Sequence, residues 1–427
     1  MEQESEFAEI AITEQQQVGW PRVAAVSSMV ALSLPTFITG LEIFHALSPR
    51  DAFWALFWGS VILFLIGSLM AAIGARTHMS SYLLVRIAFG DKGAGIVNIA
   101  FAVSLLGWFG ININLFAEAS SRLISSLFGL SISHILLSIL ASFVMTVTSL
   151  RGFAAINRLS VLMVPVLALV TVLLVVHAIR LDAFATMAAQ PNEPVMSLGD
   201  GISIVVGAII VGVIILPDIT RFVRHWSGGV ATAFVSMMIV QLIVMGAAAL
   251  AGGATRESDI LDIMLDLGLG FGAFIIVIAS SWVLNALNLY SLVLSVKSTF
   301  PARDEKIMTI VFGLVGIAAA LLNILDYFVV FLFYLSIIFV PVAGVIIIDY
   351  FFVQSSAYQI DTLKKNRALA PKAFVSSALG VVAAITMSEN IISSVTGMAA
   401  LDAMALSAFA YLALSFSDRK KTNAVSE

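Results

Sequence analysis

The sequence of 427 residues contains no cysteine, which excludes disulfide bonds, thiolate metal ligands and cysteine nucleophiles. Charged residues are also scarce, at 11% of the chain, and the formal net charge of −4 gives no support for a nucleic-acid partner. The motifs GxxxxGK[ST], HExxH and GxSxG are absent, and the five histidines have no ligand spacing. The sequence therefore predicts neither an enzyme nor a metal site or cofactor.

Apolar residues, in contrast, make up 60% of the chain, and the mean hydropathy is +1.05. A soluble protein of this length could not bury so much apolar surface, so the lipid bilayer is predicted to be its solvent. A spanning helix needs about 20 apolar residues. The pattern predicts an all-α integral membrane protein with about twelve transmembrane helices, near 23–47, 52–74, 93–121, 133–151, 158–179, 200–222, 229–252, 268–298, 306–324, 326–352, 372–390 and 396–415.

The distribution of positive charge predicts the orientation of these helices. The first residues, MEQESEFAEIAITEQQQ, are acidic and polar and lack the basic start of a signal peptide. If the N-terminus is cytoplasmic, all but four of the 22 Lys and Arg residues lie on the cytoplasmic side, the four being Arg50, Arg122, Arg180 and Arg256. The sequence thus predicts a multi-pass protein of the cell membrane with both termini in the cytoplasm.

The two halves of the chain carry helix-breaking residues at corresponding places. Pro35 and Gly40 lie in the first predicted helix, and Gly207, Gly212 and Pro217 lie in the sixth. An offset of five helices inverts the second copy relative to the membrane, and matched broken helices point to the central site of a transporter. The alternative is that Gly and Pro are simply common in membrane helices.

The stretch SLLGWFGININLFAEA places polar side chains in the middle of the third predicted helix. Trp108 and Asn112 are four residues apart and share one face. A planar polar heterocycle could stack on the indole and hydrogen-bond to the amide. The alternative interpretation is a tryptophan packed between helices and an asparagine bonded to a neighbouring backbone.

The eighth predicted helix contains ASSWVLNALNLYS, in which Ser281, Asn285 and Asn288 form one stripe. Such amides avoid lipid, so the stripe faces protein or water, and hydrogen bonding between helices is the alternative to substrate binding. The first helix has a run of hydroxyl groups that could bond to their own helix, at Ser27, Ser28, Ser33, Thr36 and Thr39.

Ionisable residues near the predicted helices are few. Glu42 and Glu118 lie toward the outer ends, where either could carry a coupling proton or extend to water. Asp218 and Arg221, in PDITRF, close the sixth helix on the cytoplasmic side, either as a gate or as a helix cap.

Four segments occur in order with similar spacing: RTHMSSYLLVRIAFGDKGAGI, GWFG, PDITRF and PVAGVIIIDYF. Together they resemble the nucleobase:cation symporter family that contains the cytosine permeases, from about Pro35 to Phe352. The resemblance implies a five-plus-five inverted-repeat (LeuT-like) fold with two additional C-terminal helices. It further implies import of nucleobases, hydantoins or related heterocycles by alternating access, driven by sodium or protons.

The resemblance also implies roles for individual residues. Trp108 would stack on the substrate, Asn285 would contact it, and Asn112 and Ser280 stand where further polar contacts are expected. Sodium-coupled members use hydroxyl side chains of the eighth helix, but this chain has Val283 and Leu284 there, so protons are favoured over sodium. Ile209 and Val211 stand where aromatic and hydroxyl groups are expected, which indicates a less polar or methylated substrate.

The domain prediction is a cytoplasmic tail over 1–22, repeats over 23–180 and 200–352, two additional helices over 372–415, and a second tail over 416–427. The predicted site comprises Trp108, Asn112, Gly212, Ser280, Ser281, Asn285 and Asn288, with the broken helices offering free backbone groups. The predicted partners are a small heterocyclic substrate and the lipid bilayer. A transport-deficient membrane sensor and a passive facilitator remain alternatives, and the sequence gives no indication of the oligomeric state.

Overall fold

The computed structural model describes residues 12–183, 194–255, 257, 259–300, 302–322, 327–359 and 370–425. Within these ranges the chain is almost entirely helical, and the only β-contact is an isolated bridge between Val18 and Val223. Arg256, residues 1–11 of the predicted N-terminal tail and residues 426–427 of the predicted C-terminal tail lie outside the described residues. The all-α prediction is confirmed.

The first half begins with the short turn η1 (Glu14–Gln16) and contains the longest helix of the molecule. Its helices are α1 (Trp20–Ala31), α2 (Leu34–Ala46), α3 (Pro49–Thr77), α4 (Ser81–Phe128), α5 (His134–Leu150) and α6 (Gly152–Arg180). Helix α4 starts twelve residues before the expected 93, because Ser80 caps a helical segment that precedes a kink at Gly90, where φ is 72° and ψ is 170°.

The second half contains three segments in which a π-helical turn interrupts or ends an α-helix. Its elements up to Thr299 are α8 (Leu198–Ile214), α9 (Pro217–Thr220), α10 (Trp226–Ala233), η2 (Phe234–Val240), α11 (Gln241–Thr255), α12 (Ile260–Asp266), α13 (Gly270–Ile275), η3 (Ile276–Ser280) and α14 (Ser281–Thr299). The remaining elements are α15 (Glu305–Ala320), α16 (Phe328–Ile348), η5 (Asp349–Val353), η6 (Ser355–Ala357), α18 (Pro371–Ser388) and α19 (Ala399–Val425).

The lengths of these helices fit a membrane protein. In the described part of the chain, nine helical segments are long and apolar enough to cross a bilayer, or ten if the bent pair α1 and α2 forms one span. Helices α5 and α15 have 17 and 16 residues and would complete the predicted twelve. The multi-pass arrangement is therefore supported, while the count of twelve stays a prediction.

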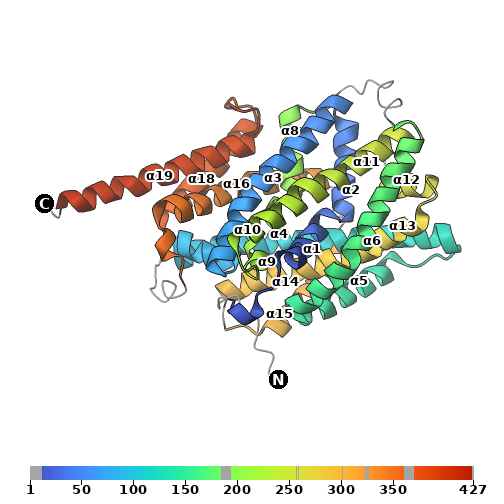
Figure 1. Ribbon diagram of the computed structural model, residues 1–427, viewed down its shortest axis with the longest axis horizontal. Helices are drawn as coiled ribbons and strands as arrows, with labels where there is room; N and C mark the ends of the chain where they lie inside the picture. Colours follow the sequence, from blue (N-terminus) through green and yellow to red (C-terminus); the bar gives the residue numbers. More distant parts are fainter. Residues whose placement is uncertain are drawn as a thin grey trace.

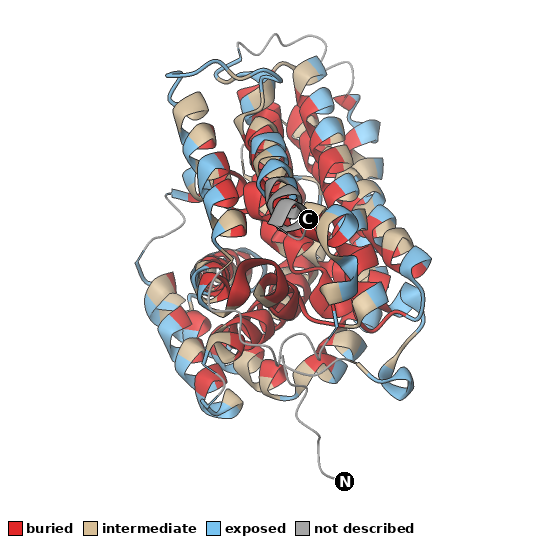
Figure 2. Cartoon of the chain, turned by 90° about the vertical axis from the view of Figure 1, so that its left-hand side faces the viewer, coloured by how far each residue is buried: buried red, intermediate tan, exposed pale blue. Residues whose placement is uncertain are grey.

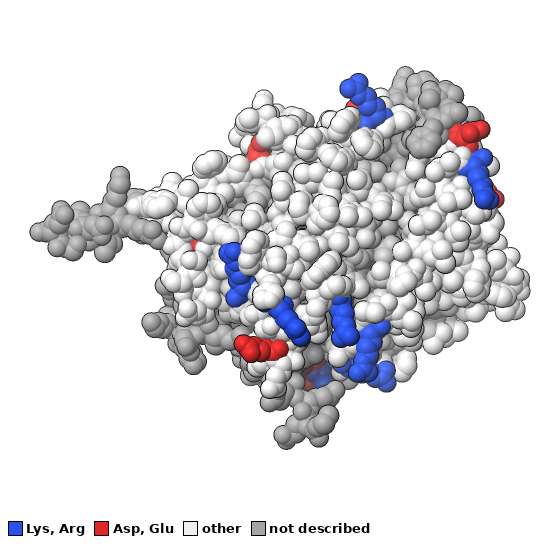
Figure 3. Space-filling model, viewed as in Figure 1, with Lys and Arg blue, Asp and Glu red and all other residues white. Residues whose placement is uncertain are grey.

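The surface of the molecule has the polarity that a bilayer requires. Buried residues line the inner faces of the helices and many outer faces are exposed, as Figure 2 shows. Large apolar side chains on these outer faces include Phe143 of α5 and Leu162 of α6, which are 65% and 63% exposed. On the face in Figure 3, most Lys and Arg side chains gather toward the lower edge, below a broad uncharged surface. This asymmetry fits the predicted orientation.

The last two helices lie at one end of the bundle, where α18 and α19 pack against each other and against α16 (Figure 1). Asp349, at the end of α16, is fully buried and joins these segments. Its carboxylate accepts hydrogen bonds from the hydroxyl groups of Tyr358 (2.7 Å) and Tyr411 (2.5 Å) and from the amide of Gln354 (3.0 Å). The division into two repeats and two additional helices remains a prediction.

Candidate functional site between two broken helices

The first broken helix consists of α1 and α2, which meet at a bend of 52°. Ser33 is extended and starts α2, with Pro35 in its first turn. The hydroxyl groups of Ser33 and Thr36 donate to the carbonyl O of Val30 at 2.8 and 3.2 Å. They satisfy a carbonyl that the interrupted helix leaves free, so the break is built by hydroxyl side chains.

The second broken helix consists of α8 and α9, separated by Ile215 and Leu216. Pro217 begins α9, because proline is favoured in the first turn and cannot donate to the preceding turn. The first interruption is a bend of 52°, whereas the second lies within a segment, Leu198–Thr220, that still counts as one span. Both interruptions stand just before a predicted proline, Pro35 or Pro217, and neither falls at Gly40 or Gly212. Pro35 and Gly40 lie inside α2 and Gly212 lies inside α8, so the breaks precede Pro35 and follow Gly212.

A cavity lies between the two breaks, α4 and α14. The space open to the centres of water molecules is about 50 Å³, and one water needs roughly 10–15 Å³. Most of its wall is apolar, with Val30, Ile209, Val211, Ile215, Leu216, Leu284, Leu287 and Met237 among the lining residues. The polar side chains in the wall are those of Ser27, Ser33, Thr36, Trp108, Asp218, Asn288 and Ser291.

Trp108 closes the cavity toward α16. Only 7% of this residue is exposed, and its ring lies edge-on to Phe328 and Phe331, with centroid distances of 6.0 and 5.6 Å. Rings in this T-shaped arrangement attract one another, and neither phenyl ring is stacked parallel on the indole, which also lines the cavity. The indole can therefore offer a flat surface to a planar molecule in the cavity.

The structure brings only some of the predicted residues together. Trp108, Gly212, Asn288 and Asp218 all line the cavity. The hydroxyl groups of Ser27, Ser33, Thr36 and Ser291 complete the polar part of the wall, and they were not predicted as site residues. The hydroxyl run in the first helix was the available signal, but such groups often bond only to their own helix.

The other predicted residues lie behind the cavity wall. Asn285 donates to the carbonyl O of Phe109 at 2.9 Å and accepts from Asn288 at 3.3 Å, so it joins α14 to α4. Asn112 donates to the carbonyl O of Trp108 at 2.8 Å, and Ser280 donates to the carbonyl O of Ile276. Among the described residues, Asn112 Oδ1 and Ser281 Oγ are buried without a partner. Substrate contact by these four residues stays a prediction.

The two residues that replace hydroxyl groups on the eighth helix are buried and apolar in their surroundings. Val283 is 1% and Leu284 is 5% exposed, and Leu284 lines the cavity. Neither side chain has an oxygen atom for a hard cation. Within the described residues, three or more His, Asp or Glu side chains nowhere gather as they would around a metal ion.

A second, larger pocket lies on the side of the cavity that the charge distribution assigns to the exterior. Glu42, Glu118, Arg122 and Asp259 line it, together with Phe328, which also contacts Trp108. Glu42 and Glu118 are exposed. Phe328 therefore separates this outer pocket from the Trp108 indole. The two glutamates do not line the central cavity.

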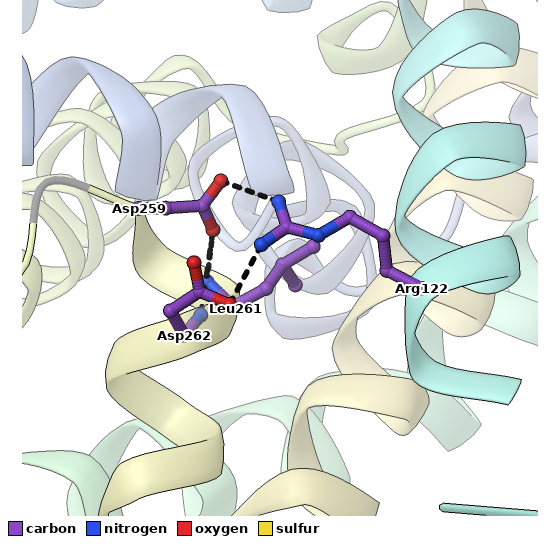
Figure 4. Close-up of polar contacts among 4 residues, drawn as sticks. All are labelled: Arg122, Asp259, Leu261 and Asp262. Carbon is purple, nitrogen blue, oxygen red and sulfur yellow. Dashed lines mark hydrogen bonds and ion pairs between the residues drawn. The ribbon is translucent and has the colours of Figure 1, made fainter. Parts of the chain in front are cut away.

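Arg122 bridges the outer pocket, as Figure 4 shows. It reaches from α4 to Asp259 (2.7 Å) and Asp262 (2.6 Å) at the start of α12. Asp259 also caps α12 by accepting from the backbone N–H of Leu261 at 2.8 Å. The three charged side chains are 38–43% exposed, so each ion pair contributes about 0.2–1 kcal/mol.

We expect Arg122→Gln to loosen this outer contact. Because two exposed ion pairs are lost, thiol labelling from outside of Ile38→Cys, which lines the outer pocket, should become about two- to tenfold faster. The chain has no other cysteine to react. Arg180→Gln, at the exposed end of α6, is the control and should leave the labelling rate unchanged. Equal rates in the two variants would contradict a closing role for Arg122.

Asp218 and Arg221, which are 1% and 0% exposed, lie at the end of the cavity that the charge distribution assigns to the cytoplasm. Asp218 Oδ1 accepts from the N–H and hydroxyl of Ser81 at 2.8 and 2.7 Å. Arg221 Nη2 donates to the hydroxyl of Tyr290 at 3.2 Å, and its Nε donates to the carbonyl O of Asp218. These contacts join α9 to α4 and α14, which fits the predicted gate better than a simple cap.

Comparison with known proteins places this architecture in a family. Residues 14–412 match the family model for permeases for cytosine/purines, uracil, thiamine and allantoin. The cytosine permease of Escherichia coli (strain K12) is 28% identical over 388 residues, which cover 90% of this chain and 90% of that protein.

Solved structures show the same fold. The inward-facing conformation of Mhp1 has a TM-score of 0.80 at 18% identity and covers 97% of this chain and 94% of its own. Mhp1, a nucleobase-cation-symport-1 family transporter, in a closed conformation with bromovinylhydantoin bound, gives 0.79 at 19% identity over 95% and 93%. A Na⁺-coupled sialic acid symporter gives 0.70 at 13% identity over 95% and 91%. The predicted fold class is confirmed, and the chain belongs to the family of permeases for cytosine/purines, uracil, thiamine and allantoin.

Proposed function

We propose that this chain imports a nucleobase or a related planar heterocycle across the cell membrane by alternating access. The observation that carries the proposal is the cavity between the two broken helices, with the Trp108 indole in its wall. Broken helices at corresponding places of inverted halves hold the substrate in such transporters. The relatives whose names mention cytosine or a hydantoin point to the same class of ligand.

Trp108 stacks on the ring of the substrate in this account, and Asn288 with the hydroxyl groups of Ser33 and Thr36 reads its polar edge. Asn112 lies one helical turn from Trp108, and its buried Oδ1, which has no partner among the described residues, is available to accept a hydrogen bond from the substrate. The aliphatic wall around Ile209 and Val211 favours a less polar or methylated ring, because an unmatched polar group there would be desolvated without a partner.

The experiment is uptake of radiolabelled cytosine, uracil, hypoxanthine, allantoin, hydantoin and hydroxymethylpyrimidine by cells that lack their own permeases. We expect one compound or one closely related pair to enter, with methylated analogues competing at least as well as the parent compound. A cell with the empty vector is the control. Binding of a compound without uptake would instead favour a membrane sensor with this fold.

The charge distribution supports a proposed membrane orientation. We expect both termini in the cytoplasm, because the exterior side keeps only four of the 22 Lys and Arg residues. A reporter domain fused to the C-terminus should therefore be inaccessible to protease added to intact cells and accessible in inverted vesicles. The reverse pattern would contradict the orientation.

We expect uptake to be independent of sodium. Val283 and Leu284 offer no oxygen ligands, so replacing sodium by choline should change the initial rate by less than about twofold, whereas loss of a coupling ion of millimolar affinity would remove most of it. A proton uncoupler should abolish accumulation in both buffers. Uptake that collapses without sodium would contradict the assignment of these two positions.

A further inference from the structure

Asp218 is a buried carboxylate in the wall of the central cavity. One oxygen, Oδ1, accepts two hydrogen bonds from Ser81, while Oδ2 has no partner among the described residues. A buried carboxylate oxygen without a donor is costly, and a proton on that oxygen removes the cost. The residue therefore combines access to the cavity with an unfilled position for a proton.

Two opposing influences act on the Asp218 carboxylate: burial disfavours its charged form, whereas the donors of Ser81 favour it. Ser81 is the first residue of α4, so Asp218 faces the positive end of the helical segment that precedes the kink at Gly90. Both bonds from Ser81 are stronger while the carboxylate is charged. A neutral carboxyl group keeps the same geometry with weaker bonds, and α9 is then held less firmly against α4.

The ionisable groups near Asp218 are Arg221 and Tyr82, whose charge and hydroxyl act on its carboxylate, and His78. Arg221 directs Nε and Nη2 to the carbonyl O of Asp218 and to the hydroxyl of Tyr290, and its Nη1 has no partner among the described residues. The Tyr82 hydroxyl donates to the carbonyl O of Ser291 at 2.8 Å. His78, at the end of α3, contacts the carbonyl O of Arg221 at 2.8 Å and is half-buried. His78 is the one histidine among these groups, so it has a control variant of its own in the test below.

We propose that Asp218 binds the coupling proton and that its protonation releases the contact that closes the cytoplasmic side. This inference rests on the proposed function, because it assumes alternating access. A proton from cavity water binds to the Asp218 carboxylate, the bonds to Ser81 weaken, and α9 separates from α4. Deprotonation into the cytoplasm restores the charged carboxylate and the closed state. Glu42 and Glu118, in the outer pocket, do not take part.

The test needs no substrate. Ser291→Cys places one thiol in the cavity wall, at a residue 1% exposed, in a chain without other cysteines. A membrane-impermeant methanethiosulfonate, added to the cytoplasmic face of inverted vesicles, labels this thiol when the cytoplasmic side opens. Rates are divided by those of Ser356→Cys, an exposed site, at the same pH, because thiol reactivity itself rises with pH.

We expect the corrected rate to be about tenfold higher at about pH 5.5 than at about pH 8, the change that one pKa unit between closed and open states gives. Asp218→Asn keeps the acceptor without the charge, so its rate should be high and change less than about twofold over the same range. His78→Asn, which tolerates the left-handed backbone of residue 78, should retain the response, as should Glu42→Gln with Glu118→Gln.

A flat profile in the parent Ser291→Cys chain would overturn the proposal, and so would an Asp218→Asn variant that keeps the pH response. If Asp218→Asn does not reach the membrane, Ser81→Ala decides. It removes one donor and should raise the labelling rate at about pH 8 while keeping the pH response, whereas an unchanged rate would overturn the proposed closing contact between Asp218 and Ser81. These outcomes do not depend on which heterocycle is transported, so they are separate from failure of the uptake experiment.

Discussion

Trp108→Ala is expected to reduce uptake of the transported heterocycle about 10- to 100-fold, since stacking of a base on an aromatic side chain contributes roughly 1–3 kcal/mol. The indole is the one aromatic ring in the central cavity wall as described, and the rings of Phe328 and Phe331 hold it edge-on. Removing it leaves an apolar space in place of a flat surface. The measurement is the initial uptake rate over a range of concentrations, with the amount of protein in the membrane determined for each variant.

Trp108→Phe is the matched control, because it keeps an aromatic face of smaller area. We expect it to retain uptake within about tenfold of the wild type, as the smaller ring keeps part of the stacking energy. If Trp108→Ala transports as well as the wild type while its membrane level is unchanged, Trp108 does not bind substrate. Equal loss in both variants would point to packing against α16 instead.

Gly207→Ala should prevent stable folding or lower the thermal midpoint in detergent strongly. A Cβ atom at Gly207 would overlap the backbone carbonyl O of Leu332, so α8 and α16 could not approach as they do. A carbonyl fixed in a helix cannot move aside as a flexible side chain can. Overpacking of this kind costs about 1–3 kcal/mol or more, and it would also displace the helix that carries Ile209 and Val211.

Gly246→Ala provides the comparison for that effect. Gly246 lies in α11, and a Cβ atom there meets no atom within 4 Å. Alanine has the higher helix propensity, so this variant should be as stable as the wild type or slightly more stable. We expect the thermal midpoint of Gly246→Ala to equal or exceed that of the wild type. The midpoint of Gly207→Ala should lie well below both. Similar midpoints for the two variants would contradict close packing of α8 on α16.

The fold was accessible from sequence because lipid imposes simple rules. Runs of apolar residues, positive charge on alternate segments and matched Pro and Gly positions are all local features of the chain. The exact breaks were less accessible. Pro35 marks the first turn of the helix after the break, while Ser33 and Thr36 satisfy the free carbonyl of Val30. Gly40 serves close packing, since a Cβ there would overlap the backbone of Met245.

The candidate site was accessible only in part. Trp108 and Asn288 line the cavity as predicted. The side-chain amide of Asn285 instead donates to the carbonyl O of Phe109 and accepts from Asn288. Sequence places both asparagines on one buried stripe, and the same burial suits substrate binding and bonding between helices. Asp218 was predicted as a gate residue, and its contact with Ser81 joins positions 137 residues apart, which no local pattern reveals.

The most direct test of the central claim is accumulation of the transported heterocycle in proteoliposomes of the purified chain under an imposed pH gradient, acidic outside and without sodium. The account predicts that the internal concentration exceeds the external concentration while the gradient lasts and falls back when an uncoupler is added. Uptake that stops at equal concentrations would indicate a passive facilitator. No uptake of a compound that binds to the purified protein would contradict import and favour a sensor.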